Sequence, residues 1–253
     1  AAPQQPLPVT FDRKSAPPLH KTIQSVDDID AAVAHYCSLL PYGKVMATAQ
    51  HISTDIDYSM PGRDAVAAAL KARTSADNCE RDIYSSYILH RFLGELEKHG
   101  DPIVFQFSLG AEALPHESAS RVGQRTVGQL AEIVARYPRL RFMCFLSSRH
   151  ANQSLCTLAR ELPNLSLCGY WWHNFFPGTI RQVIEERLDM LPVNKQIGFF
   201  SDAYCVEWTY AKAAITRKLL AEVLANKVQL GQYSFNDIHD VAYGVLHQSS
   251  CDL

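Results

Sequence analysis

The sequence predicts an α/β fold on a parallel sheet, and within that class it favours a partial (β/α)8 barrel. Near-continuously apolar runs of strand length alternate with longer stretches of helical period, which is the pattern of strands buried on both faces of a parallel sheet. A doubly wound sheet commonly carries a glycine-rich nucleotide turn, and the sequence contains neither G-x-G-x-x-G nor G-x-x-x-x-G-K-[ST]. Polar residues instead follow strand after strand, as they do at the mouth of a barrel.

Strands and helices are expected in regular alternation. The expected strands are Lys44–Ala49, Ile103–Leu109, Leu140–Leu146, Leu165–Cys168 and Ile197–Phe200. The expected helices are Val26–Leu40, Arg81–Lys98, Val122–Arg136, Ser154–Glu161, Thr179–Leu191 and Glu207–Leu230. No repeat, low-complexity tract or linker interrupts the series, so we expect a single domain over residues 1–253.

Composition bounds the class of partner. The 253 residues carry a net charge of −2, so there is no electrostatic reason to expect nucleic acid or an anionic membrane as partner. No apolar run approaches the roughly 18 residues that a bilayer span requires. Seven cysteines lie far apart without a C-x-x-C pair, which predicts reduced thiols in a cytoplasmic protein and argues against a thiolate metal site.

The segment Gly198–Tyr210 (GFFSDAYCVEWTY) carries the main candidate, Asp202. A carboxylate directly after a buried strand would project into a barrel mouth, where it can bind a divalent metal or transfer a proton. In the competing interpretation, Ser201 and Asp202 cap the helix that follows. The local sequence leaves both interpretations open.

The segment Leu167–Pro177 (LCGYWWHNFFP) follows another expected strand. Its aromatic rings can form a wall against the apolar face of a sugar, and we expect at least one of Trp171 and Trp172 in the core instead. His173 and Asn174, just past the strand, are the better candidates for contact with a ligand.

Three further strand ends carry polar side chains. Gln50 and His51 follow the first strand, where a histidine also serves as a hydrogen-bonded structural residue. Gln106 and Ser108 share one face of their strand by alternation. Arg149, in SSRHAN, is either an anchor for a carboxylate or a solvated loop arginine.

Taken in order, these motifs resemble those of the uronate isomerase family, (β/α)8 barrels of the amidohydrolase superfamily that interconvert aldose and ketose forms of glucuronate and galacturonate. The matching segments are AQHIS at Ala49–Ser53, QFSLG at Gln106–Gly110, SSRHAN at Ser147–Asn152, WWHN at Trp171–Asn174 and SDAY at Ser201–Tyr204. Asp202 and His51 are retained. Ser108 takes the place of a family histidine, Gln50 that of an aspartate, and Tyr204 that of the arginine that would meet the uronate carboxylate.

The resemblance implies an isomerase that moves a proton between C2 and C1 of a ring-opened hexuronate through an enediol. It implies Asp202 as base and as ligand of a divalent metal such as Zn²⁺, with His51 as a second catalytic residue. The implied substrate-binding residues are Trp172, His173, Asn174, Arg149, Tyr204 and Gln106. A small sugar acid is the implied partner, and a homo-oligomer the implied assembly.

The departures leave two alternatives open. One is a metal-dependent hydrolase or decarboxylase on the same barrel, and the other is a non-catalytic relative that keeps the sugar cleft. Ser108 and Tyr204 at the family's histidine and arginine positions favour both.

The family's H-x-H motif, which supplies two metal ligands from the first strand, does not occur in this sequence. The chain corresponds to about strands 3–8, and so few strands cannot close an eight-stranded barrel. We therefore expect the missing N-terminal strands to lie against Lys44–Ala49 and Ile197–Phe200, and metal binding by this chain alone to be weak or absent. The geometric check is whether these two strands have partners on both sides.

Overall fold

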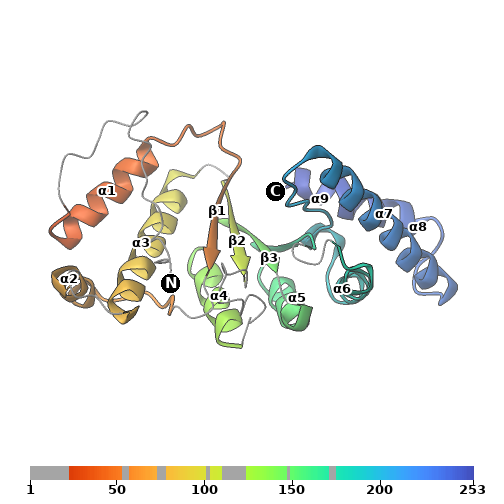
Figure 1. Cartoon of the computed structure of the whole chain (residues 1–253), viewed down its shortest axis with the longest axis horizontal. Helices are drawn as coiled ribbons and strands as arrows, with labels where there is room; N and C mark the ends of the chain where they lie inside the picture. The colour runs from red at the N-terminus through yellow and green to blue at the C-terminus, as the bar shows by residue number, and fades with distance from the viewer. Residues whose placement is uncertain are drawn as a thin grey trace. The chain divides into compact units, whose positions relative to one another are not determined.

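The computed structural model describes residues 23–52, 57–72, 78–100, 103–109, 124–146, 149–170 and 175–253 (Figure 1). For residues 51, 52, 78–81 and 124 it describes the backbone alone. The chain forms two compact units, one of residues 1–46 and 55–101 and the other of residues 47–54 and 102–253. The single domain expected over residues 1–253 stays a prediction. None of the described helices combines the length and apolarity that a bilayer span requires.

The first unit is helical. It contains α1 (Val26–Ser38), α2 (Arg63–Ala72) and α3 (Asn78–His99). Ser25 and Asp28 cap α1 reciprocally, because the Ser25 hydroxyl accepts from the Asp28 amide while the Asp28 carboxylate accepts from the Ser25 amide. Ile29, Val66 and Tyr87, one from each helix, belong to the buried cluster that joins them.

The second unit is built on a parallel sheet of five strands in the order β1-β2-β3-β4-β5. The strands are β1 (Ala47–Ile52), β2 (Val104–Leu109), β3 (Arg141–Leu146), β4 (Leu165–Cys168) and β5 (Gln196–Ile197). The helices are α4 (Gln124–Arg136), α5 (Asn152–Glu161), α6 (Pro177–Met190), α7 (Val206–Gln229), α8 (Asp237–Tyr243) and α9 (Ser249–Cys251). Short 3₁₀ turns lie at Arg149–Ala151 and Val193–Lys195, and Gly244–Gln248 is π-helical. This alternation confirms the predicted α/β class (Figure 1).

The two faces of the sheet have different side chains. Phe105, Phe107 and Phe142 pack together on one face. The Phe107 ring stacks on that of Phe142 at 5.5 Å between centroids and is tilted against that of Phe105 at 4.8 Å. The other face carries a buried cluster of Val104, Met143, Phe145, Cys168 and Ile197, against which Ala47, Phe200 and Leu253 pack.

Within the described residues the sheet is open. β1 pairs with β2 and β5 pairs with β4, and these two outer strands do not pair with each other. The expectation that the chain's own described strands leave the barrel unclosed is therefore confirmed, and the architecture is a partial barrel.

The predicted bounds of two strands, β1 and β5, are wrong by more than one residue. Lys44 and Val45 donate their amides to the Pro41 carbonyl in a turn, so β1 begins at Ala47 rather than Lys44. Gln50 and His51 consequently lie inside β1, not after it. β5 ends at Ile197 because the next amide, that of Gly198, donates to the Val245 carbonyl at 2.7 Å instead of extending the ladder.

The buried thiols agree with the prediction from sequence. Cys144 and Cys168 are buried and free of disulfides, as are Cys37 and Cys156. Burial raises the pKa of Cys144 to about 12, which keeps that thiol protonated at neutral pH.

Candidate active site

Backbone register places several candidate positions in one row across the sheet. His51 pairs with Ser108, Ser108 with Phe145, Phe145 with Cys168, and Cys168 with Ile197. Gln106 lies one row closer to the strand start, between Ala49 and Met143, and its amide nitrogen is 3.7 Å from the Met143 sulfur. Gln106 and Ser108 are half-buried between fully buried neighbours, so both lie on the face that carries Met143 and Phe145.

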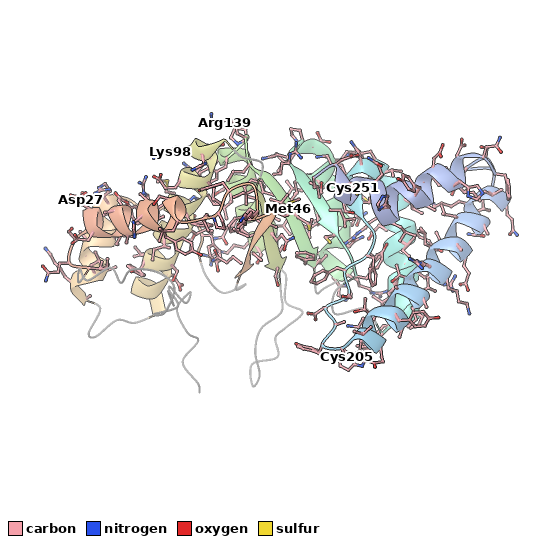
Figure 2. All side chains as sticks on the ribbon, turned by 90° about the horizontal axis from the view of Figure 1, so that it is seen from above. Asp27, Met46, Lys98, Arg139, Cys205 and Cys251 are labelled. Atoms are coloured by element: carbon pink, nitrogen blue, oxygen red, sulfur yellow. The ribbon has the colours of Figure 1, made fainter. Side chains whose placement is uncertain are left out.

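Asp202 lies in the segment that connects β5 to α7. Residues 198–205 have no regular structure, and Asp202 is exposed with a φ of 43°. Of the residues that the structure describes, it is the one non-glycine residue with positive φ. The N-cap of α7 is Cys205, so the interpretation of Asp202 as that helix's cap is wrong. Figure 2 shows Cys205 on the side of the sheet toward which the strand arrows point.

A buried lysine holds this connecting segment. The Lys212 ammonium, in α7, donates to the Ser201 carbonyl at 2.6 Å and to the Asp202 carbonyl at 3.0 Å. The same nitrogen lies over the Phe175 ring at 4.6 Å and over the Trp208 ring at 5.4 Å from their centroids. The Lys212 residue is 3% exposed, so its charge is stabilised by carbonyl dipoles and ring faces.

Phe175, Tyr204 and Trp208 form an aromatic wall beside Asp202. The Trp208 ring meets the Phe175 ring at 5.7 Å and the Tyr204 ring at 5.9 Å, both edge to face. All three rings are exposed, Tyr204 most of all at 88%. Exposed rings that are fixed by each other can pack against the C–H face of a sugar.

Close backbone contact joins the end of β4 to the start of the Asp202 segment. Gly169 has a φ of 49°, and its amide donates to the Ile197 carbonyl at 2.6 Å. A Cβ on Gly169 would lie 2.4 Å from the Cβ of Phe200, so no larger residue fits there. Buried Arg187, in α6, donates to the Gly169 carbonyl at 3.0 Å and to the Asn152 side chain at 2.9 Å. These bonds hold the backbone at Gly169 in place.

The other candidates are placed less fully. Arg149 opens the 3₁₀ turn after β3 and is exposed, which fits either role suggested for it. Trp172, His173, Asn174 and the side chain of His51 lie outside the described residues. Their roles stay predictions.

The described residues do not complete a metal site. Within them, no three His, Cys, Asp or Glu side chains gather in a way that could hold a metal ion. A catalytic zinc site needs about three protein ligands, and Asp202 is the one candidate ligand whose side chain the structure describes. No step of a reaction can be derived through a metal from these residues.

Sequence reasoning missed Phe175, Trp208 and Lys212. Tyr204, Trp208 and Lys212 are spaced by four residues, which places Trp208 and Lys212 on one face of α7. That spacing was a usable signal. Lys212 lies in the second turn of α7 and not at a strand end, where the candidate residues were expected.

Searches with family models and among curated proteins found no match, but solved structures with the same fold exist. A uronate isomerase of Thermotoga maritima superposes with a TM-score of 0.77 at 14% identity, over 90% of this chain and 54% of that protein. The glucuronate isomerase of Caulobacter crescentus gives a TM-score of 0.73 at 15% identity, over 89% of this chain and 51% of the enzyme. A Lactobacillus casei protein described as a metal-dependent hydrolase gives a TM-score of 0.57 at 15% identity, over 90% of this chain and 57% of its own.

The chain thus spans about half the length of the solved structures it matches. TM-scores of 0.77 and 0.73 establish a shared fold, and sequence identity of 14–15% leaves the reaction to be tested. The resemblance read from the motifs is confirmed at the level of the fold.

Proposed function

Starting from the fold that this chain shares with half of a uronate isomerase barrel, we propose that it binds a hexuronate and contributes Asp202 to aldose–ketose isomerisation. The whole activity also requires groups beyond the described residues, His51 and His173 among the candidates. The cytoplasmic location and the homo-oligomer expected from sequence belong to the same proposal.

One observation carries the proposal: Asp202 sits beside an aromatic wall at the carboxyl end of a parallel sheet, in a backbone conformation that the protein holds at a cost. Left-handed backbone is uncommon for a residue with a Cβ, although aspartate adopts it more readily than most, and such conformations cluster at functional sites. The Lys212 ammonium donates to the Ser201 carbonyl and to the carbonyl of Asp202 itself.

In this proposal the Asp202 carboxylate takes the proton from C2 of the open-chain aldose and returns it to C1. The electron pair of the C2–H bond forms the C1–C2 double bond of the enediol, and the C1 oxygen takes up a proton. When the proton returns to C1, the C2 hydroxyl gives up its own proton and becomes the carbonyl of the ketose. Rings of the aromatic wall would cover the apolar face of the sugar. Tyr204 offers a hydroxyl but no charge to the sugar's carboxylate, so Arg149 is the proposed anchor.

A divalent metal, Zn²⁺ by the expectation from sequence, belongs to the proposal, but no step is assigned to it because the described residues do not complete its site. A structural neighbour described as a metal-dependent hydrolase supports a metal in this fold. The same neighbour supports the second candidate, hydrolysis or decarboxylation on this barrel.

The test compares the 253-residue chain with its Asp202→Asn and Asp240→Asn variants. Asp240 is also an exposed aspartate of the second unit, so it is a matched control. We expect Asp202→Asn to lower turnover of D-glucuronate or D-galacturonate by about 100-fold or more, the usual contribution of a general base. Asp240→Asn should stay near wild type, and circular dichroism should be unchanged in both.

Hexuronate binding is measured in parallel by saturation-transfer NMR, with D-glucose as the uncharged comparison. Binding without turnover would favour the non-catalytic alternative. Near-normal turnover by Asp202→Asn would remove Asp202 from the chemistry, and absence of both binding and turnover would refute the proposal for this chain.

A further inference from the structure

We infer that Lys212 is a positioning residue, whose ammonium fixes the left-handed backbone of Asp202 and thereby sets where the Asp202 carboxylate lies. The inference rests on the function proposed for Asp202. It assigns to a residue of α7 the positioning of the Asp202 carboxylate, whereas the strand-end residues are proposed to contact the substrate.

The contacts of Lys212 bracket Asp202. Its nitrogen donates to the carbonyl of the preceding residue, Ser201, at 2.6 Å and to the carbonyl of Asp202 itself at 3.0 Å. Successive carbonyls alternate sides along an extended strand, so one ammonium can bind both only if the chain turns between them. The φ of 43° at Asp202 supplies that turn.

The ammonium itself has little freedom. Phe175 and Trp208 place ring faces 4.6 and 5.4 Å from it, and Trp208 precedes Lys212 by four residues on the same face of α7. Among the described residues, no carboxylate lies within ion-pair distance of Lys212. Its position therefore depends on the two carbonyls and the two rings.

Burying the charge of Lys212 without a carboxylate partner carries a desolvation penalty that an apolar side chain would avoid. Methionine has nearly the same length and would pack between the two rings without the desolvation penalty of an ammonium. The charge of Lys212 must therefore serve its hydrogen bonds, and both of those described end on the Asp202 segment.

The experiment uses the ¹³C,¹⁵N-labelled 253-residue chain and the variants Lys212→Met, Lys212→Arg and Lys218→Met. Lys218 is an exposed lysine of the same helix, so its variant is the matched control. The direct readouts are the backbone chemical shifts and the HN–Hα coupling of Asp202, which report φ without any ligand.

We expect Lys212→Met to shift the Asp202 signals toward those of an averaged backbone, while Lys218→Met leaves them unchanged and Lys212→Arg restores them in part. Affinity for D-glucuronate should fall about tenfold in Lys212→Met, because the segment would then be ordered only on binding. Unchanged Asp202 signals in Lys212→Met would overturn the inference.

The readouts separate this inference from the proposed function. If the wild-type chain binds no hexuronate but Asp202 responds to Lys212→Met, the positioning role stands and the substrate is wrong. If Lys212→Met does not fold, the test is made on the wild-type chain. The inference then requires a slowly exchanging Lys212 ammonium signal with Overhauser contacts to the Trp208 ring. Absence of that signal would refute the positioning role of Lys212.

Discussion

Asp30 is the residue on which the charge network of the first unit converges. Its carboxylate accepts from the Arg63 guanidinium at 2.5 Å and from the Tyr87 hydroxyl at 2.8 Å, and it forms an ion pair with Arg91 at 2.8 Å. Burial raises the pKa of Asp30, but the hydrogen bonds from Arg63 and Tyr87 and the charge of Arg91 outweigh it and hold the pKa below 3.8. The ionised carboxylate therefore stabilises the folded state.

The sign of the pH dependence follows. A carboxyl whose folded pKa is lowered contributes stability that is present above its unfolded pKa and is lost as the pH falls through the folded pKa. We expect Asp30→Asn to lower the free energy of unfolding at pH 7 by about 1 kcal/mol, a typical value for a partly exposed network. The difference from wild type should shrink as the pH falls below the ordinary pKa of an aspartate and through the lowered pKa of Asp30.

Urea unfolding at pH 7 and at pH 2.5 checks this, with Asp64→Asn as the control. Asp64 is an exposed carboxylate of α2, and its removal should change stability little at either pH. An Asp30→Asn effect of equal size at both pH values would show that packing, not ionisation, accounts for the loss.

At the scale of elements, the junction of β4 and β5 depends on Gly169. Its positive φ of 49° and the 2.4 Å approach to the Phe200 Cβ both exclude a side chain. We expect Gly169→Ala to destabilise the second unit by about 2 kcal/mol or more, from backbone strain and overpacking together.

Gly128→Ala is the matched control. Gly128 is exposed in α4, with nothing within 4 Å of an added Cβ, so alanine should be neutral or stabilise by up to about 1 kcal/mol. Thermal unfolding of both variants distinguishes the two cases. Equal melting temperatures would mean that β5 and Phe200 can move aside.

Elements with a strong periodic pattern were predictable from sequence. β4 and the end of α4 match the expected bounds, because apolar strands and amphipathic helices carry the signal directly. α2 and α8 were missed because both are short, with ten and seven residues. The error at β1 arose because a turn at Pro41 uses amides that an extended reading assigns to the strand.

The candidate site was less predictable, for a physical reason. Sequence order shows which residues follow a strand, so Asp202 could be found. The left-handed φ of Asp202 and the reach of Lys212 back to it depend on tertiary contacts, which a local pattern does not record. The resemblance drew attention to Tyr204 because it stands where the family has an arginine. Its edge-to-face contact with Trp208 could be seen only in the structure.

At the scale of the whole molecule, the described residues form an open sheet and an incomplete ligand set, and both suggest the same behaviour toward metal. Zinc needs about three protein ligands for a tight site, and in a barrel these come from several strands. We expect titration calorimetry of this chain with Zn²⁺ to show weak binding. Asp202→Asn should weaken it further. A tight single site that survives Asp202→Asn would contradict the prediction.

The aromatic contacts of Lys212 also determine what can influence the Asp202 segment. The Lys212 ammonium is held close to the Phe175 and Trp208 rings by its own side chain. A group linked to its binding site by a short chain has an effective concentration of about millimolar or higher. A soluble amine at lower concentration cannot displace it from the Phe175 and Trp208 rings. The backbone geometry around Asp202 is thus set when the chain folds, and free cationic metabolites do not change it. We therefore expect a site that is always formed rather than one regulated by such metabolites.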